Sequence, residues 1–163
     1  MKTAICPGSY DPVTYGHLDI IRRSAVLVDK LIVTVFVNPN KKGSMFSIEE
    51  RLDMLRETTK DIPNVEVDTS TGLLTAYAAK KKCHLLIRGL RAFSDFEYEF
   101  QRALMLKKID PTLETAFFMT DGRYSYLSST GVRELAYFDG DVSHMVPPYV
   151  ADMVKKKMSS IKK

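Results

Sequence analysis

The chain has 163 residues, of which 45% are hydrophobic and 27% are charged, and these proportions are typical of one globular domain. Its net charge is +4, and no stretch approaches the roughly 20 consecutive apolar residues that a membrane span requires. No signal-peptide pattern precedes the first strand, and Cys6 and Cys83 are far apart in the sequence, so we expect a cytoplasmic protein with reduced, buried thiols and no disulfide or cysteine metal site.

Five short apolar segments alternate with amphipathic ones along the chain. The segment 31–37, LIVTVFV, is a β-branched run with the length of a buried strand. Four further strands are expected at residues 3–6, 65–67, 83–87 and 115–119. Because nearly continuous apolar strands separated by helices are typical of a parallel sheet covered on both faces, the pattern predicts a Rossmann-like, doubly wound α/β sheet of about five parallel strands. No linker or repeat divides the chain, so we expect residues 1–163 to form a single domain.

The helices are predicted from periodicity and from capping signals. The first has four apolar residues at spacings of three and four, which places them on one face: Leu18, Ile21, Ala25 and Val28. Two more are preceded by capping-box patterns, in which a glutamate follows a serine by three positions: Ser47 with Glu50, and Ser94 with Glu97. The others are expected at 73–81, at 129–137 and after Pro147 and Pro148. In such a fold ligands bind beyond the carboxyl ends of the strands, so functional residues are expected in the loops there.

The loop after the first predicted strand is the most informative stretch. Residues 7–17 read PGSYDPVTYGH, so a glycine and two prolines force a sharp turn before a helix that begins at about Gly16. A helix start offers unpaired amides and a partial positive charge to a phosphate, and Ser9, Thr14 and His17 add side-chain donors. The stretch matches neither the G-x-G-x-x-G dinucleotide fingerprint nor the Walker loop. A histidine in a first helical turn is, taken alone, more often structural, but this context predicts a phosphate site.

Cationic side chains are concentrated in the loops after the second and fourth predicted strands. The first of these loops, residues 38–46, contains two lysines between proline and glycine, and its spacing fits a solvated surface and a phosphate clamp equally well. In the second, Arg88 and Arg91 flank a glycine, and a guanidinium matches phosphate as a planar fork of donors. A surface ion pair, for instance with Asp95, is the alternative, but the position at the sheet edge favours phosphate.

Hydroxyl and basic residues mark the last third of the chain. Ser128, Ser129 and Thr130 precede a predicted helix, where they are either ordinary N-cap residues or a second cradle for an anion. The basic tail, residues 155–163, contains five lysines. A basic tail can contact nucleic acid, but a solvated helix face with a frayed end is more common. No RNA-binding signature is present, so we expect no nucleic-acid partner.

Several of these stretches together resemble one known family. The segment 7–17 is similar to the signature of the nucleotidylyltransferase superfamily, whose motif is [HT]-x-G-H, and most of all to the bacterial phosphopantetheine adenylyltransferases. The same family has stretches similar to NPNKKGSMF at 38–46, to IRGLR at 87–91 followed by DFEYE at 95–99, and to GDV at 140–142. The matching segments extend from Ala4 to about Val154, and IRGLR with DFEYE is the most specific of them.

This sequence departs from the family pattern at a few positions. Tyr10 replaces the commoner phenylalanine, and one extra residue stands between Lys42 and Met45. Thr130 and Arg133 stand where serine and often lysine are expected, and SSTxxR also occurs in the sister nicotinamide-mononucleotide enzymes. The resemblance therefore specifies the chemistry more narrowly than the acceptor.

The resemblance implies roles for residues of this chain. The catalytic residues would be His17, Lys41 and Arg91. The acceptor would contact Ser9, Lys41, Leu74 and Arg88. ATP would contact Ser9, Tyr10, His17, Gly89, Leu90, Arg91, Glu99, Tyr124, Ser125, Tyr126, Leu127, Ser128, Ser129 and Thr130. Read from the residues alone, Leu74 would be an ordinary core residue.

The implied reaction transfers the adenylyl group of ATP to 4′-phosphopantetheine and releases dephospho-coenzyme A and pyrophosphate. The acceptor phosphate is already an anionic nucleophile, so no general base is needed, and we expect direct in-line attack without a covalent intermediate. Mg²⁺ is expected as cofactor, held mainly by phosphates and water, with no metal-binding residues of the protein. The resemblance also implies a homohexamer and feedback inhibition by coenzyme A.

Other functions remain open at the level of the sequence. The acceptor can instead be another phosphorylated compound, such as nicotinamide mononucleotide, and a cytidylyltransferase would use the same loops. From a different class, the chain can be a nucleotide sensor that releases no pyrophosphate, or a basic RNA-binding module.

Overall fold

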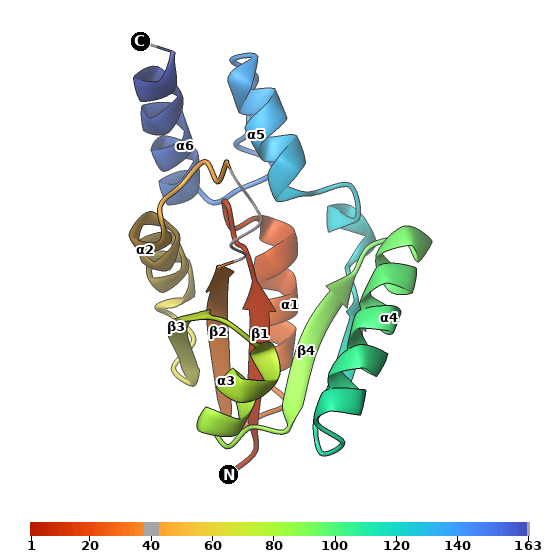
Figure 1. Ribbon diagram of the computed structural model, residues 1–163. Helices are drawn as coiled ribbons and strands as arrows, with labels where there is room; N and C mark the ends of the chain where they lie inside the picture. The colour runs from red at the N-terminus through yellow and green to blue at the C-terminus, as the bar shows by residue number, and fades with distance from the viewer. Residues whose placement is uncertain (38–42, 163) are drawn as a thin grey trace.

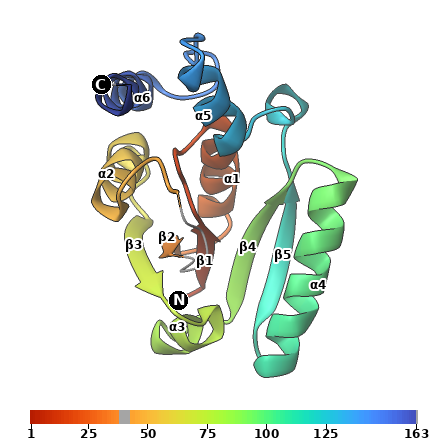
Figure 2. The ribbon, with the colours of Figure 1, turned by 45° about the horizontal axis from the view of Figure 1, so that its top comes forward.

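The protein is described here by a computed structural model that covers residues 1–37 and 43–162. Its centre is a parallel sheet of five strands in the order β3-β2-β1-β4-β5 (Figures 1 and 2). The strands are β1 Thr3–Gly8, β2 Lys30–Val37, β3 Val65–Thr71, β4 Leu85–Leu90 and β5 Glu114–Met119. The predicted doubly wound α/β sheet of parallel strands is thus confirmed. Each strand extends past its predicted segment at one end, but β4 begins at Leu85, two residues after the predicted start at Cys83.

Helices cover both faces of the sheet. They are α1 Tyr15–Ala25, α2 Ile48–Thr59, α3 Leu74–Lys80, α4 Phe93–Ile109, α5 Ser129–Tyr137 and α6 Pro148–Ile161, with a short 3-10 helix η1 at Gly122–Tyr124. α1 and α2 pack on one face, α3 and α4 on the other, and α5 and α6 lie beyond the carboxyl ends of the strands (Figures 1 and 2). Among the described residues no helix has the length and apolarity needed to cross a bilayer.

The two faces of the sheet have separate cores because side chains alternate along a strand. In β1, Ala4 and Cys6 point into the core beneath α1 and α2, whereas Ile5 points into the core beneath α3 and α4. Cys83 belongs to the second core, and both cysteines are buried free thiols, as expected. Apolar side chains at successive positions of β1 are therefore buried on both sides, which is why the central strands read as continuous apolar runs.

The capping signals have different outcomes at two of the helices. Ser47 accepts the N–H of Glu50, and the Glu50 side chain accepts the N–H of Ser47, so the predicted capping box of α2 is confirmed. The second predicted box is wrong, because α4 begins at Phe93 and Ser94 already lies inside its first turn. At this helix start the side chain of Asp95 accepts the N–H of Arg91 at 3.2 Å. The last helix does begin at Pro148, with Pro147 at its N-cap.

Helix α1 packs directly against the carboxyl end of β4, where the structure has a close contact between helix and strand. A Cβ atom added at Gly89, in β4, would stand 2.9 Å from Cγ1 of Ile20, so glycine allows α1 to approach β4 closely. β1 lies between β2 and β4. From β1 the chain first adds β2 and β3 on one side, and then crosses over to add β4 and β5 on the other side. Such a reversal opens a crevice at the carboxyl ends of the two central strands.

Candidate active site

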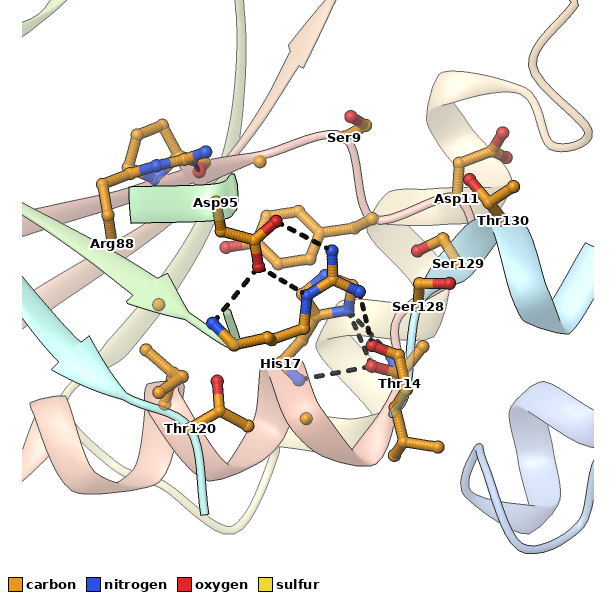
Figure 3. A pocket seen from close by; sticks show the side chains of 18 of the residues that line it. Ser9, Asp11, Thr14, His17, Arg88, Asp95, Thr120, Ser128, Ser129 and Thr130 are labelled. Atoms are coloured by element: carbon orange, nitrogen blue, oxygen red, sulfur yellow. Dashed lines mark hydrogen bonds and ion pairs between the residues drawn. The ribbon is translucent and has the colours of Figure 1, made fainter. Parts of the chain in front are cut away.

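A pocket of about 670 Å³ opens at this crevice, between the ends of β1 and β4 (Figure 3). Its walls come from the loop after β1, the start of α1, the end of β4, the first turns of α4 and the start of α5. The side chains labelled in Figure 3 converge on it from these separate elements. The three loops that the sequence singled out after the first, fourth and fifth strands therefore meet at one place.

The start of α1 is closed by an unusual capping box. The Thr14 hydroxyl accepts the N–H of His17 at 3.3 Å, and the ring nitrogen Nδ1 of His17 accepts the N–H of Thr14 at 3.0 Å. A histidine thus takes the place that glutamate has in an ordinary capping box. Because a backbone N–H can only donate, Nδ1 must be the unprotonated ring nitrogen, and the neutral imidazole carries its proton on Nε2.

The surroundings of His17 favour this neutral form. Burial, together with the smaller effects of the positive charges of Arg91 and Arg88, lowers its pKa from 6.5 to about 4. The ring of Tyr10 meets the imidazole edge-on, with the ring centroids 5.1 Å apart. Tyr10 has a positive φ of 47° and points inward, where its hydroxyl donates to the carbonyl oxygen of Cys6 at 2.9 Å. The imidazole is therefore held in one orientation as a neutral hydrogen-bond donor.

Most amides at the start of α1 already have partners. The N–H of Tyr15 donates to the carbonyl oxygen of Met145 at 3.0 Å, and that of His17 is taken by Thr14. Of the first three amides of the helix, Gly16 alone has no partner within residues 1–37 and 43–162. The expectation that this helix start presents a set of unpaired amides is therefore wrong in part: the imidazole of His17 is its main donor.

The start of α5 is more open. Ser128 is the N-cap and accepts the N–H of Gly131 at 2.9 Å, while the hydroxyl of Ser129 donates to the carbonyl oxygen of Pro12 at 2.7 Å. The amides of Ser129 and Thr130 have no partner in the described part of the chain. Ser128, Ser129 and Thr130 all line the pocket. The N-cap reading of Ser128 is confirmed, and the turn also faces the pocket, which is the position that an anion cradle requires.

The two arginines at the end of β4 are both held by carboxylates. Nε of Arg88 donates to Glu99 at 2.8 Å, a second nitrogen pairs with the other carboxylate oxygen, and a third donates to the carbonyl oxygen of Pro7. Nε of Arg91 donates to Asp95 at 2.9 Å, and its NH1 donates to the carbonyl oxygen of Leu127 at 2.7 Å. The ion pair that the sequence offered as an alternative for Arg91 is thus present, and Arg91 still lines the pocket.

Asp11 is a site residue to which sequence reasoning gave no role. Its buried carboxylate accepts the N–H groups of Met45 and Phe46 at 2.9 and 2.8 Å, which fastens the end of the loop after β2 to the loop after β1. Arg133, noted in the sequence only as a departure from the family, donates to the carbonyl oxygen of Asp11 at 2.6 Å. The sequence did contain a signal for this role, because an acidic residue in a turn that is predicted to bind phosphate would repel the ligand unless other groups of the protein engage it.

The structure gathers most, not all, of the predicted site residues. Those that line the pocket are Ser9, Tyr10, His17, Arg88, Gly89, Arg91, Glu99, Leu127, Ser128, Ser129 and Thr130. Those that do not are Leu74, Leu90, Tyr124, Ser125 and Tyr126; Leu74 is buried in the core beneath α3 and α4. Lys41 lies outside the described residues. The pocket also contains residues that sequence reasoning did not assign, among them Asp11, Ser94, Asp95, Tyr98, Thr120 and Arg133.

Carboxylates of the pocket are engaged with protein groups. Asp11 is bound to two amides, Asp95 to Arg91, and Glu99 to Arg88. Within the described ranges, no three side chains of the His, Cys, Asp or Glu type come together as metal ligands would. A divalent cation in this pocket would therefore need most of its ligands from elsewhere, and a triphosphate with water supplies such oxygens.

Comparison with known proteins adds three findings. Residues 5–135 match the cytidylyltransferase-like family. The chain is 57% identical to a phosphopantetheine adenylyltransferase of Caldanaerobacter subterraneus, over 96% of this chain and 98% of that one, and 51% identical to one of Clostridium botulinum, over 98% and 96%. A solved structure from Vibrio parahaemolyticus, provisionally named a nicotinate-nucleotide adenylyltransferase, superposes with a TM-score of 0.69 over 97% of this chain and 95% of its own; at 18% identity it shows a shared fold.

Proposed function

The chain belongs to the phosphopantetheine adenylyltransferases, within the cytidylyltransferase-like family, and from this premise we propose how its pocket carries out the reaction. The enzyme transfers the adenylyl group of ATP to 4′-phosphopantetheine and forms dephospho-coenzyme A and pyrophosphate. A bond forms between a phosphate oxygen of the acceptor and the α-phosphorus of ATP, and the bond from that phosphorus to the pyrophosphate breaks. The attack is in-line and no covalent intermediate with the protein is formed.

The observation that carries this proposal is the fixed tautomer of His17. With Nδ1 bound to the Thr14 amide, Nε2–H is left to donate toward the pocket. A neutral imidazole donor beside the α-phosphate stabilises the negative charge that builds up on its oxygens during attack. Because the acceptor phosphate is itself the nucleophile, His17 does not act as a base, and its low pKa does not impede the reaction.

The other pocket residues divide between the two substrates. Ser9, Lys41 and Arg88 hold the acceptor phosphate, and Arg91 with the start of α5 holds the β- and γ-phosphates of ATP. In support of this division, Arg88 is bonded to Pro7 near the end of β1, whereas Arg91 is bonded to Leu127, one residue before the cap of α5. Correct alignment of the two phosphates accounts for much of the rate enhancement in such reactions.

We propose Mg²⁺ as the cofactor, with few or no ligands from the protein. The engaged state of Asp11, Asp95 and Glu99 supports this, because each would have to leave a bonded partner to bind the ion. Such an ion would supply positive charge that offsets part of the charge of the triphosphate. The protein then holds the nucleotide–metal complex through the cationic and amide donors of the pocket.

The test offers the purified protein ATP and Mg²⁺ with 4′-phosphopantetheine, with nicotinamide mononucleotide, with nicotinate mononucleotide, or with no acceptor. Pyrophosphate release is recorded, and the products are identified by mass spectrometry. We expect pyrophosphate and dephospho-coenzyme A with 4′-phosphopantetheine alone. Turnover with a mononucleotide but not with phosphopantetheine would overturn the acceptor, and binding of ATP without any turnover would indicate a sensor.

We also propose a homohexamer in the cytoplasm that is inhibited by coenzyme A. The support for assembly is an apolar surface on α4, whose exposed side chains are Phe96, Phe100, Leu104, Met105 and Ile109. Several exposed apolar side chains on one helix are typical of a surface that contacts another protein. Light scattering should give six times the mass of one chain, and Leu104→Glu should give smaller species.

Inhibition by coenzyme A has a chemical basis. Coenzyme A contains the pantetheine arm of the acceptor, so it should compete with 4′-phosphopantetheine in initial-rate measurements.

A further inference from the structure

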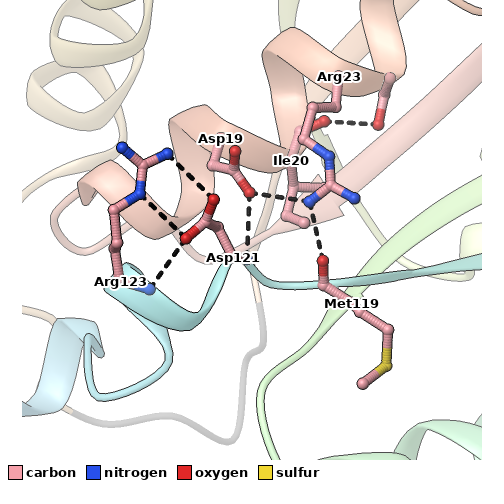
Figure 4. Close-up of polar contacts among 7 residues, drawn as sticks. Asp19, Ile20, Arg23, Met119, Asp121 and Arg123 are labelled. Carbon is pink, nitrogen blue, oxygen red and sulfur yellow. Dashed lines mark hydrogen bonds and ion pairs between the residues drawn. The ribbon is translucent and has the colours of Figure 1, made fainter.

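A set of polar contacts joins α1 to the exit of β5, outside the pocket (Figure 4). NH1 of Arg23 donates to Oδ2 of Asp19 at 3.0 Å, one turn earlier on α1, and also to the carbonyl oxygen of Met119 at 2.8 Å. The same Asp19 oxygen accepts the N–H of Asp121 in a long bond of 3.5 Å. Asp19 and Arg23 thus contact the chain immediately before and immediately after Thr120.

The chain that follows is held to α1 a second time. The Asp121 carboxylate accepts the N–H, Nε and NH2 of Arg123 at 2.9, 3.1 and 3.0 Å, which closes the short helix η1. These bonds lower the pKa of Asp121 to about 2, so the carboxylate is ionised at neutral pH. The ring of Tyr124, at the end of η1, stacks on Tyr15, the first residue of α1, with centroids 6.3 Å apart. The segment 119–124 is therefore attached to α1 at both of its ends.

This attachment relates two parts of the active site to each other. His17 is on the same helix, two residues before Asp19, and the segment 119–124 leads directly into Leu127 and the start of α5. Thr120 lines the pocket, and its N–H continues the sheet by donating to the carbonyl oxygen of Leu90 at 2.8 Å. The spacing between the imidazole and the start of α5 consequently depends on how firmly α1 holds this segment.

We propose that Asp19 and Arg23 are positioning residues for adenylyl transfer, which hold the segment 119–124 so that the ATP-binding start of α5 stays in register with His17. The proposal rests on the proposed roles of His17 and of the start of α5. Neither Asp19 nor Arg23 lines the pocket, so both act through the loop.

The burial of the pair distinguishes this role from one in general stability. The Arg23 side chain is 44% exposed, and the Asp19 side chain is 14% exposed. Ion pairs with an exposed partner contribute little to the free energy of unfolding. Loss of Arg23 should therefore leave the fold intact, whereas the Met119 carbonyl loses a donor and the Asp19 carboxylate, mostly buried, loses its charged partner. The consequence should appear in nucleotide binding rather than in stability.

The experiment compares Arg23→Ala, Arg23→Lys and the control Arg22→Ala by steady-state kinetics with each substrate varied in turn. Arg22 is the neighbouring arginine of α1 and pairs with Asp61 on the surface at 2.7 Å. Arg23→Ala should raise KM for ATP about tenfold, the effect of one lost charged hydrogen bond, with KM for 4′-phosphopantetheine within about twofold of wild type. Arg23→Lys keeps an ammonium group that can donate to both oxygens, so it should recover most of the loss.

Hydrogen exchange gives a second readout that does not depend on turnover. The amides of 119–124 should exchange faster in Arg23→Ala, with α2 and α3 unchanged. Should Arg23→Ala fail to fold, Asp19→Asn, which keeps the shape but removes the charge, takes its place in both measurements. Equal changes in both KM values, no change in either, or the same change in Arg22→Ala would overturn the positioning role. Failure of wild type to form dephospho-coenzyme A would instead count against the proposed function, while the exchange measurement would still test the contacts.

Discussion

Two helix starts face the pocket, and they are built in opposite ways. At α1 the amides of Tyr15 and His17 are bonded to Met145 and Thr14, so the donors left for a ligand are the amide of Gly16 and, chiefly, the imidazole of His17. At α5 the N-cap of Ser128 takes one amide, and those of Ser129 and Thr130 have no partner among the described residues. The start of α1 therefore presents mainly one oriented side chain, and the start of α5 presents backbone amides.

The difference indicates a division of work between the two helices. A single donor held by a capping box suits a place where charge develops only in the transition state, because its position is fixed in advance. A turn with unpartnered amides suits phosphates that are bound throughout the reaction. Substitutions at α1 should therefore affect kcat, whereas those at α5 should affect the KM for ATP.

Removal of the imidazole is the strongest test of this division. His17→Ala should lower kcat by about 10²–10³, the usual loss for one transition-state donor, with a small change in KM for ATP. The control is His84→Ala, since His84 is exposed and bonds to Thr112 far from the pocket. Circular dichroism should show both variants folded. A folded His17→Ala enzyme with kcat within threefold of wild type would remove the proposed role of α1.

The next largest effect is expected from the two arginines at the end of β4, Arg88 and Arg91. Arg88→Ala should weaken binding of 4′-phosphopantetheine by about ten- to a hundredfold, the range for charged hydrogen bonds, and binding of a non-hydrolysable ATP analogue much less. Arg91→Ala should give the reverse ranking, because Arg91 is bonded to Leu127 beside α5. Isothermal titration calorimetry with both ligands measures this.

The Arg88 variant has a structural side effect that requires its own control. It leaves the buried Glu99 without its partner, and an unpaired buried charge is strongly destabilising. The double variant Arg88→Ala with Glu99→Gln removes that charge and should show the same ranking of the two ligands. If both arginine variants weakened both ligands equally, the assignment of separate phosphate sites would be wrong.

A smaller effect is expected from the two serine caps. Ser128→Ala and Ser47→Ala each remove an N-cap hydroxyl that accepts an amide, and each should lower the free energy of unfolding by about 1 kcal/mol. Only Ser128 lies at the pocket, so Ser128→Ala alone should also raise KM for ATP by roughly fivefold, or about 1 kcal/mol of binding. Urea denaturation and initial rates separate the two quantities. A raised KM in Ser47→Ala would mean that the effect follows stability and not position.

The features of the fold that could be predicted from the sequence are those that depend on residues close together in the chain. The sheet and the α2 capping box depend on local pattern, and both were predicted correctly. The capping box predicted at Ser94 is not formed, because the helix begins earlier and the side chain of Asp95 accepts the N–H of Arg91 instead. Asp95 is just as local as Ser94, but no sequence pattern marked it as the residue that would bond this backbone group. Local sequence patterns therefore predict that a helix or strand exists, whereas competition between neighbouring capping residues sets the residue at which it begins.

The parts of the site that escaped prediction depend on contacts between distant segments. Asp11 bonds residues 34 and 35 positions away, and the amide of Tyr15 is taken by Met145, 130 positions along the chain. Nothing in the spacing of residues 7–17 shows that Met145 would fold over the helix start. The sequence predicted which loops meet, because strand ends of a parallel sheet must meet, and the partners of individual amides needed the tertiary structure.

The smallest expected effect on turnover is that of pH on His17. Its pKa is lowered from 6.5 to about 4 by burial and by the charges of Arg91 and Arg88, so the imidazole should remain neutral, with its proton on Nε2, from pH 8 down to about 5. An unfolded histidine takes up a proton near pH 6.5. The free energy of unfolding should therefore include a contribution from His17 that is complete above pH 6.5 and is lost as the pH falls from 6.5 toward 4.

Ring ¹⁵N shifts in NMR measure the tautomer and the midpoint directly, and urea denaturation at several pH values measures the stability change. His17→Gln has no group that titrates there, so its unfolding free energy should decline less than that of wild type between pH 6.5 and 4. A midpoint above 7 in the free enzyme would mean that α1 presents a cation at neutral pH, like Arg88 and Arg91. The contrast between an oriented neutral donor at α1 and an anion cradle at α5 would then disappear, because both helix starts would act by positive charge.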